Sequence, residues 1–255
     1  MRCASVESGR QREAPIHLNG AEYAVVLVAV ALGAAVQGSV GFGANLIAVP
    51  VLALVEPDAL PATLTLLVVP LAAGMAWRER HRVHRSGVAW LMMGRLPGTV
   101  LGAVVVAAVS GDALAVLLGG AVLAAVVMSL RVVTVPVTPG TTFGVGVASG
   151  AMGTATSIGG PPVALLYQHR EGPVLRATLA VVFALGTLVS ITAQAIAGVV
   201  AGWHLVLAAA LVPGTLAGLV ASGPIARRVD AGRVRPLVLA FATAASVATI
   251  VRGLT

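Results

Sequence analysis

The segment GTATSIGGPPVALL, Gly153–Leu166, places two glycines and two prolines in the middle of an apolar stretch. Glycine and proline are the residues least compatible with the interior of a helix. No Asp, Glu, Lys or Arg occurs anywhere in residues 132–168. We therefore expect a helix that is interrupted at Gly159–Gly160 and begins again at Pro161, inside an apolar environment.

The overall composition is that of a membrane protein. Of the 255 residues, 58% are hydrophobic and 10% are charged, whereas soluble domains carry about 25% charged residues. The net charge of +7 is spread over short loops. We interpret this charge as a topology signal and a contact with anionic membrane lipid, not as a nucleic-acid surface.

The long uncharged runs predict membrane-spanning helices. Only helices and closed barrels can span lipid, and the runs lack the alternation of barrel strands. We expect an all-α, polytopic membrane protein with about eight transmembrane helices, some of them broken or re-entrant. The expected helical segments are 21–37, 44–55, 58–77, 87–109, 113–130, 140–152, 161–168, 174–196, 203–222 and 236–252.

An internal repeat divides the chain. PGTVLG at Pro97–Gly102 matches PGTLAG at Pro213–Gly218, and Pro57 and Pro173 are separated by the same number of residues. The glycines near residues 38–43 then correspond to those near 153–160. We expect a polar N-terminal tail over residues 1–20, a first transmembrane repeat over 21–131 and a second over 140–255.

The basic loops predict that the two repeats have opposite orientations. The loop RERHRVHR, Arg78–Arg85, precedes the first PGT helix, whereas RRVDAGRVR, Arg227–Arg235, follows the second. Since basic loops stay on the cytoplasmic side, the corresponding helices cross the membrane in opposite directions. This is an inverted repeat, as in many secondary transporters. The composition, rich in Ala, Val, Gly and Arg, leads us to expect a bacterial inner membrane.

A broken helix within lipid exposes backbone groups, so it survives only when it is buried in protein or lines a wet cavity. Each new helix would direct its positive N-terminal end at the break. Two such starts meeting near the midplane would form a site for a small anion. The opposing interpretation is that the small residues only allow helices to pack closely. The candidate substrate-binding residues are Gln37, Ser39, Gly41, Gly43 and Asn45 at the first break, Thr154, Thr156, Ser157, Gly159, Gly160 and Pro161 at the second, and Arg95.

The two glycine-rich segments resemble a known family. GAAVQGSVGFGANLIAVPVLALV, Gly33–Val55, and ASGAMGTATSIGGPPVALL, Ala148–Leu166, are similar to the paired segments of the TauE/SafE sulfite exporter family. Phe42 and Asn45 stand where a run of glycines would fit the family better. The resemblance extends over nearly the whole chain and implies a transporter of sulfite, sulfonates or related small sulfur anions.

Two polar residues within apolar segments have more than one interpretation. A buried Arg is costly and is by default functional, so Arg95 could hold an anionic substrate. Alternatively, its side chain could extend back to the membrane interface. For Gln194, a hydrogen bond between helices is the expected role.

The remaining chemistry is sparse. Cys3 is the only cysteine, and the five His have no nearby pair of carboxylates, so we expect no metal site and no cofactor. An intramembrane enzyme acting on lipid or peptide is the alternative function, but Ser157 has no evident base. We therefore expect a secondary transporter without catalytic residues. An anion channel cannot be distinguished from a carrier, and the oligomeric state is not predicted.

Overall fold

The computed structural model describes residues 18–109, 112–131, 134–228 and 231–254, and these ranges contain helices and connecting segments but no strand. The all-α prediction is therefore confirmed. Of the polar tail expected at residues 1–20, all but residues 18–20 lies outside the described residues. The α-helices are α1 Gly20–Val40, α2 Ala44–Val55, α3 Ala62–Glu79, α4 Arg85–Ala108, α5 Asp112–Leu130, α6 Pro139–Thr156, α7 Gly160–Tyr167, α8 Gly172–Ile196, α9 Gly202–Arg228 and α10 Ala231–Leu254.

The helix ends follow from local residue chemistry. Helix α1 begins with a capping box, in which Asn19 Oδ1 accepts from the Glu22 N–H and Glu22 Oε2 accepts from the Asn19 N–H, each at 2.9 Å. Helix α6 begins with Thr138 as its N-cap, followed by Pro139 in the first turn. Helix α7 begins with two prolines in its first turn, as the restart expected at Pro161 requires.

Several helices are long and apolar enough to cross a membrane. Within the described residues, length and composition identify five: Gly20–Val40, Arg85–Ala108, Asp112–Leu130, Gly172–Ile196 and Gly202–Pro224. Helix α3, which carries Arg78 and Glu79 in its last turn, and helix α6 are not among them. The number of about eight spans therefore remains a prediction.

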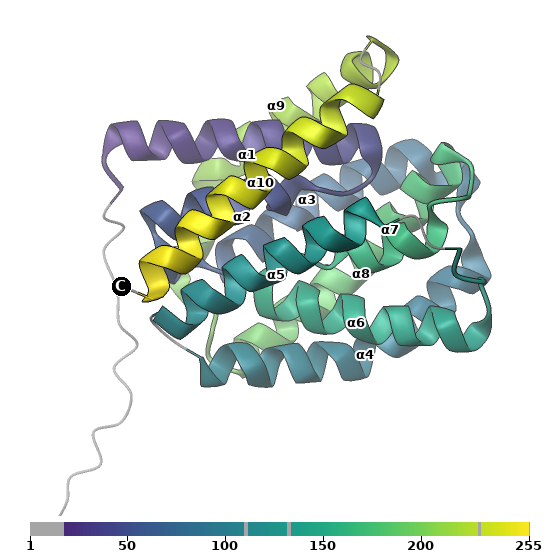
Figure 1. Cartoon of the computed structure of the whole chain (residues 1–255), viewed down its shortest axis with the longest axis horizontal. Coiled ribbons are helices and arrows are strands. Elements are labelled where there is room, and N and C mark those ends of the chain that lie inside the picture. Colours follow the sequence, from purple (N-terminus) through teal and green to yellow (C-terminus); the bar gives the residue numbers. More distant parts are fainter. Residues whose placement is uncertain (1–17, 110–111, 132–133, 229–230, 255) are drawn as a thin grey trace, which may run out of the picture.

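Helices α1, α4 and α6 run along the long axis of the molecule, while α5 and α10 slope across it in the same direction (Figure 1). Helix α1 packs along α9, α4 along α6, α3 along α8, and α5 along α10. Helix α2 also contacts α10, and α7 contacts α5. Each of these pairs thus joins a helix from the first half of the sequence to one from the second half.

Small residues bring the paired helices into close contact. A Cβ atom added to Gly102 on α4 would lie 2.5 Å from the carbonyl oxygen of Ala151 on α6. A Cβ atom on Gly218 of α9 would lie 2.1 Å from the carbonyl oxygen of Ala31 on α1. These two glycines end the repeated PGTVLG and PGTLAG motifs, so close packing is their role.

The two short helices lie in the protein interior. In α2 every residue from Ala44 to Pro50 is buried, and in α7 every residue from Gly160 to Ala164 is buried. Hydrophobic clusters surround both helices, with Leu46 and Leu52 in one and Val163 and Leu166 in another. The helix breaks are therefore enclosed by protein, as lipid would require.

Candidate functional site

The first helix break lies between α1 and α2. Helix α1 ends at Val40, and two glycines with positive φ, Gly41 at 107° and Gly43 at 113°, reverse the chain before α2 begins at Ala44. A side chain would be strained at these φ values, so glycine is required at both positions. The helix extends beyond the expected end at residue 37, because Gly38, Ser39 and Val40 are still part of it.

The second break lies between α6 and α7. Ser157 follows the last residue of α6 and adopts a left-handed conformation with φ 61° and ψ 11°. It is the one non-glycine residue with positive φ in the described ranges. Helix α7 then begins at Gly160. Holding a serine in this conformation has an energetic cost, which suggests that its side chain is needed there.

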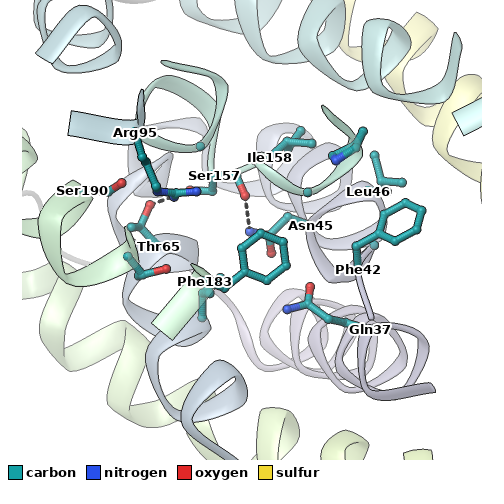
Figure 2. Close-up of a pocket in the computed structure, with 17 residues that line it drawn as sticks. Gln37, Phe42, Asn45, Leu46, Thr65, Arg95, Ser157, Ile158, Phe183 and Ser190 are labelled. Atoms are coloured by element: carbon teal, nitrogen blue, oxygen red, sulfur yellow. Dashed lines mark hydrogen bonds between the residues drawn. The ribbon is translucent and has the colours of Figure 1, made fainter. Parts of the chain in front are cut away.

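The two breaks are tied to each other. Asn45 Nδ2, in the first turn of α2, donates a hydrogen bond of 2.7 Å to the carbonyl oxygen of Ser157 (Figure 2). Gln37 Oε1 accepts from the N–H of Ala44 at 3.2 Å, which satisfies one of the free donors at the start of α2. Side-chain amides thus replace water at both breaks.

A cavity lies where the breaks meet, and it encloses about 490 Å³ when its open mouth is counted. Helices α1, α2, α3, α4, α6, α7 and α8 all contribute to its wall. The lining residues are Gln37, Phe42, Gly43, Asn45, Leu46, Thr65, Val68, Arg95, Gly153, Ser157, Ile158, Gly159, Gly160, Pro161, Phe183, Thr187 and Ser190.

Arg95 supplies the charge of this cavity. Arg95 is only 3% exposed. Its Nη1 donates a hydrogen bond of 2.9 Å to Ser149 Oγ. Ser149 Oγ in turn donates to the carbonyl oxygen of Gly159 at 2.7 Å. The guanidinium is therefore held in the interior and does not extend back to the membrane interface, so that interpretation is wrong.

The guanidinium of Arg95 is not neutralised by the protein. The ion pairs among the described residues join Glu79 to Arg78 and Arg176, and none involves Arg95. Its Nε atom is buried and has no hydrogen-bond partner. A Cβ atom on Gly186 would lie 2.1 Å from this Nε, so the glycine on α8 makes room for the guanidinium. A buried cation with an unused N–H group can bind an anion.

A hydrogen-bonded network closes one end of the cavity. The hydroxyl oxygens of Thr65 and Ser157 are 2.6 Å apart, and Ser157 Oγ donates to the carbonyl oxygen of Pro61 at 2.8 Å. Gln194 Nε2 donates to the carbonyl oxygen of Thr154 at 2.7 Å and to Thr65 Oγ1 at 3.3 Å. The predicted role of Gln194 in joining helices is confirmed, since it links α8 to α3 and α6.

Apolar side chains lie on the side of the cavity away from Arg95. Phe42, Leu46 and Ile158 line this side together with the amides of Gln37 and Asn45, and Phe183 lies between this side and Thr65 (Figure 2). Gly160 is in close contact with both phenylalanine side chains, because an added Cβ atom would lie 3.0 Å from Phe42 Cβ and 3.3 Å from Phe183 Cζ.

Eight of the twelve residues predicted from the sequence line the cavity, and four do not. Those in the wall are Gln37, Gly43, Asn45, Arg95, Ser157, Gly159, Gly160 and Pro161. Thr154 lies just behind it, with its hydroxyl 2.8 Å from that of the lining residue Ser190. Thr156 Oγ1 donates to the carbonyl oxygen of Met152, Ser39 Oγ donates to that of Ala35, and Gly41 packs against Arg176.

The prediction missed the part of the wall that α3 and α8 contribute. A signal for α8 was present in the sequence, because Phe183, Thr187, Ser190 and Gln194 recur at helical spacing and fall on one face. For Thr65 on α3 there was no comparable signal, since a lone threonine in an apolar helix commonly bonds to its own backbone. Thr65 does this as well, donating to the Pro61 carbonyl oxygen at 2.9 Å.

Comparison with known proteins identifies one family. The family model described as "Sulfite exporter TauE/SafE" matches residues 25–249. The match covers both helix breaks, Arg95 and the whole of the cavity wall. No curated protein and no solved structure matches the chain.

Proposed function

Because the chain belongs to the sulfite exporter TauE/SafE family, we propose that this multi-pass membrane protein is a secondary transporter that carries a small anion, such as sulfite or an organosulfonate, across a bacterial inner membrane. One observation above all supports the assignment of the site. Arg95 is buried at the cavity without a carboxylate partner, and its Nε has an unused N–H group.

The backbone adds to the attraction for an anion. Helices α2 and α7 both begin at the cavity, at Ala44 and Gly160. A helix N-terminus carries roughly half a positive charge. Gln37 already satisfies the N–H of Ala44 at the start of α2. At the start of α7, Pro161 and Pro162 have no N–H, so Gly160 and Val163 are the donors there. We propose that the anion is held by Arg95 and by hydroxyl groups such as that of Ser190, with the start of α7 contributing its positive potential.

We further propose that residues 21–131 and 140–255 form an inverted repeat. The packing supports this, because exchanging α1 with α6 and α4 with α9 converts the α1–α9 contact into the α6–α4 contact. Exchanging α2 with α7, α3 with α8 and α5 with α10 in the same way converts the α1–α2 pair into α6–α7 and maps the α3–α8 and α5–α10 pairs onto themselves. An inverted repeat around a central site is the arrangement that permits alternating access.

The central helices α3 and α8 are placed to control access. Glu79 Oε1 of α3 lies 3.1 Å from Arg176 Nε of α8 at one end of this pair. Thr65 of α3 accepts from Gln194 of α8 at the other end. The cavity wall lies between these two contacts, with Val68 on α3 and Phe183, Thr187 and Ser190 on α8. We propose that loosening one contact at a time would open the cavity to one side of the membrane.

The enzyme alternative has no supporting observation. The hydroxyl of Ser157 is bonded to the Pro61 carbonyl and to Thr65. Of the histidines in the described ranges, none lines the cavity. A serine nucleophile needs an adjacent general base, and no residue that lines the cavity supplies one.

The decisive experiment measures anion binding to the purified protein by isothermal titration, with sulfite and methanesulfonate as ligands. Arg95→Gln should lower the affinity by about 10- to 100-fold, the cost of a lost charge-assisted hydrogen bond. Arg131→Gln is the matched control, because Arg131 is exposed and lies outside the cavity wall. If neither anion binds to the unmodified protein, the proposed function is wrong. Equal affinities for Arg95→Gln and the control would place the site elsewhere.

A further inference from the structure

The cavity wall carries a single charge. Among the described residues that line the cavity, Arg95 is the only one with a charged side chain, and none is Asp, Glu, His, Lys, Cys or Tyr. The ion pair of Glu79 and Arg176 lies outside the wall. Within the described part of the chain Arg95 forms no ion pair, and its Nε has no hydrogen-bond partner. The protein therefore presents one unbalanced positive charge to whatever the cavity binds.

The other polar groups of the wall are neutral. They include the amide groups of Gln37 and Asn45, the hydroxyl groups of Thr187 and Ser190, and the backbone N–H of Gly160. Neutral donors can form hydrogen bonds with an anion and so replace part of its hydration. They do not change the net charge of the occupied cavity, which depends on Arg95 and the anion alone.

The helix ends at the two breaks do not supply a second full positive charge. The start of a helix carries about half a positive charge, and its end carries about half a negative charge. Helix α2 begins next to the end of α1, and α7 begins next to the end of α6. Each positive start is therefore accompanied by a negative end. The start of α7 can attract an anion at short range, but the breaks add little to the total charge.

We propose that the cavity selects anions with one negative charge, such as hydrogensulfite and sulfonates, over dianions of the same size, such as sulfate and fully deprotonated sulfite. This inference rests on the proposed function, because it assigns anion binding to Arg95. A monoanion balances the charge of Arg95, whereas a dianion replaces an excess positive charge by an excess negative one. The cost of removing an ion from water rises with the square of its charge, so a dianion loses more hydration for the same hydrogen bonds.

Three anions with the same arrangement of heavy atoms isolate the effect of charge. Methanesulfonate, sulfamate and sulfate each place four groups around sulfur, but only sulfate carries two negative charges. Sulfamate has a polar amino group where methanesulfonate has a methyl group, so a preference shared by both monoanions does not come from apolar contact. In titrations of the purified full-length protein, both monoanions should bind at least about tenfold more tightly than sulfate.

Sulfite provides a second measurement, in which one ligand changes its charge. It takes up a proton near neutral pH to become hydrogensulfite, and none of the described lining residues has a side chain that titrates there. The apparent affinity for total sulfite should therefore rise about fivefold as the pH falls from about 8 to about 6. Methanesulfonate keeps its single charge over this range and is the control for changes in the protein itself.

The outcomes distinguish this inference from the function on which it rests. If none of the four anions binds, the proposed function itself is wrong. If sulfate binds as tightly as either monoanion, anion binding at the cavity stands and selection by charge is wrong. A ratio of sulfite affinity to methanesulfonate affinity that does not rise as the pH falls would likewise overturn the selection by charge.

Discussion

Asn45 Nδ2 donates a hydrogen bond of 2.7 Å to the carbonyl oxygen of Ser157, so an amide at one helix break closes the backbone of the other. The two residues are far apart in the sequence, and they lie in the two segments that carry the family resemblance. The carbonyl of Ser157 follows the end of α6, where backbone oxygens have no partner within their own helix. This contact makes the two breaks a single unit around the cavity.

Replacing Asn45 by Ala should destabilise the protein, because it leaves the partly buried carbonyl of Ser157 without this donor. The expected cost is about 1–3 kcal/mol, seen as a lower thermal unfolding midpoint in detergent. Asn45→Asp should be at least as harmful, since a carboxylate cannot donate to a carbonyl oxygen. An unchanged midpoint for both variants would show that water replaces the amide and that the breaks are not coupled through it.

Substitutions of Ser157 can separate the effect of its backbone conformation from the effect of its hydroxyl group. Ser157→Gly should relax the left-handed backbone, whereas Ser157→Ala keeps that conformation with a less suitable residue. We expect the Gly variant to be more stable than the Ala variant by roughly 1 kcal/mol in thermal unfolding. Both variants lose the contact with Thr65, and so both should reduce uptake of anions into proteoliposomes. The reverse order of stability would contradict the assigned backbone strain.

The parts of the site that could be predicted from sequence are those with local chemistry. The breaks at Gly41–Gly43 and Ser157–Gly160 depend on residues that are themselves unusual in a helix, and both lie where the glycines and prolines indicate. Arg95 was predicted for the same reason, since a charge is unusual in an apolar helix. Thr65 and Phe183 are ordinary residues for an apolar helix, and only the packing of α3 against α8 brings them to the cavity.

The absence of a side chain at Gly186 should matter for anion binding. A Cβ atom there would lie 2.1 Å from Arg95 Nε, so Gly186→Ala should displace the guanidinium from the cavity. We expect the affinity for methanesulfonate to fall at least tenfold, the cost of losing one charge-assisted hydrogen bond.

Gly120→Ala is the matched control for that measurement. Gly120 also lies within a helix, and an added Cβ atom would have no neighbour within 4 Å. This variant should bind like the unmodified protein and gain up to about 1 kcal/mol in stability, because Ala favours the helix. Unaltered binding by Gly186→Ala would mean that the Arg95 side chain is free to adopt another position without loss.

The contact between Glu79 and Arg176 should hold α3 and α8 together at the end of this helix pair that lies next to the basic loop. The pair is partly buried, with side-chain exposures of 16% and 25% and a separation of 3.1 Å. A double-mutant cycle with Glu79→Gln and Arg176→Gln should give a coupling energy of about 1 kcal/mol in thermal unfolding. Because the pair joins the two helices that carry the cavity wall, breaking it should also change the rate of anion uptake. Arg80→Gln, on the exposed turn that follows α3, is the control and should alter neither quantity. A coupling energy near zero together with normal uptake would show that this ion pair does not hold the two helices together.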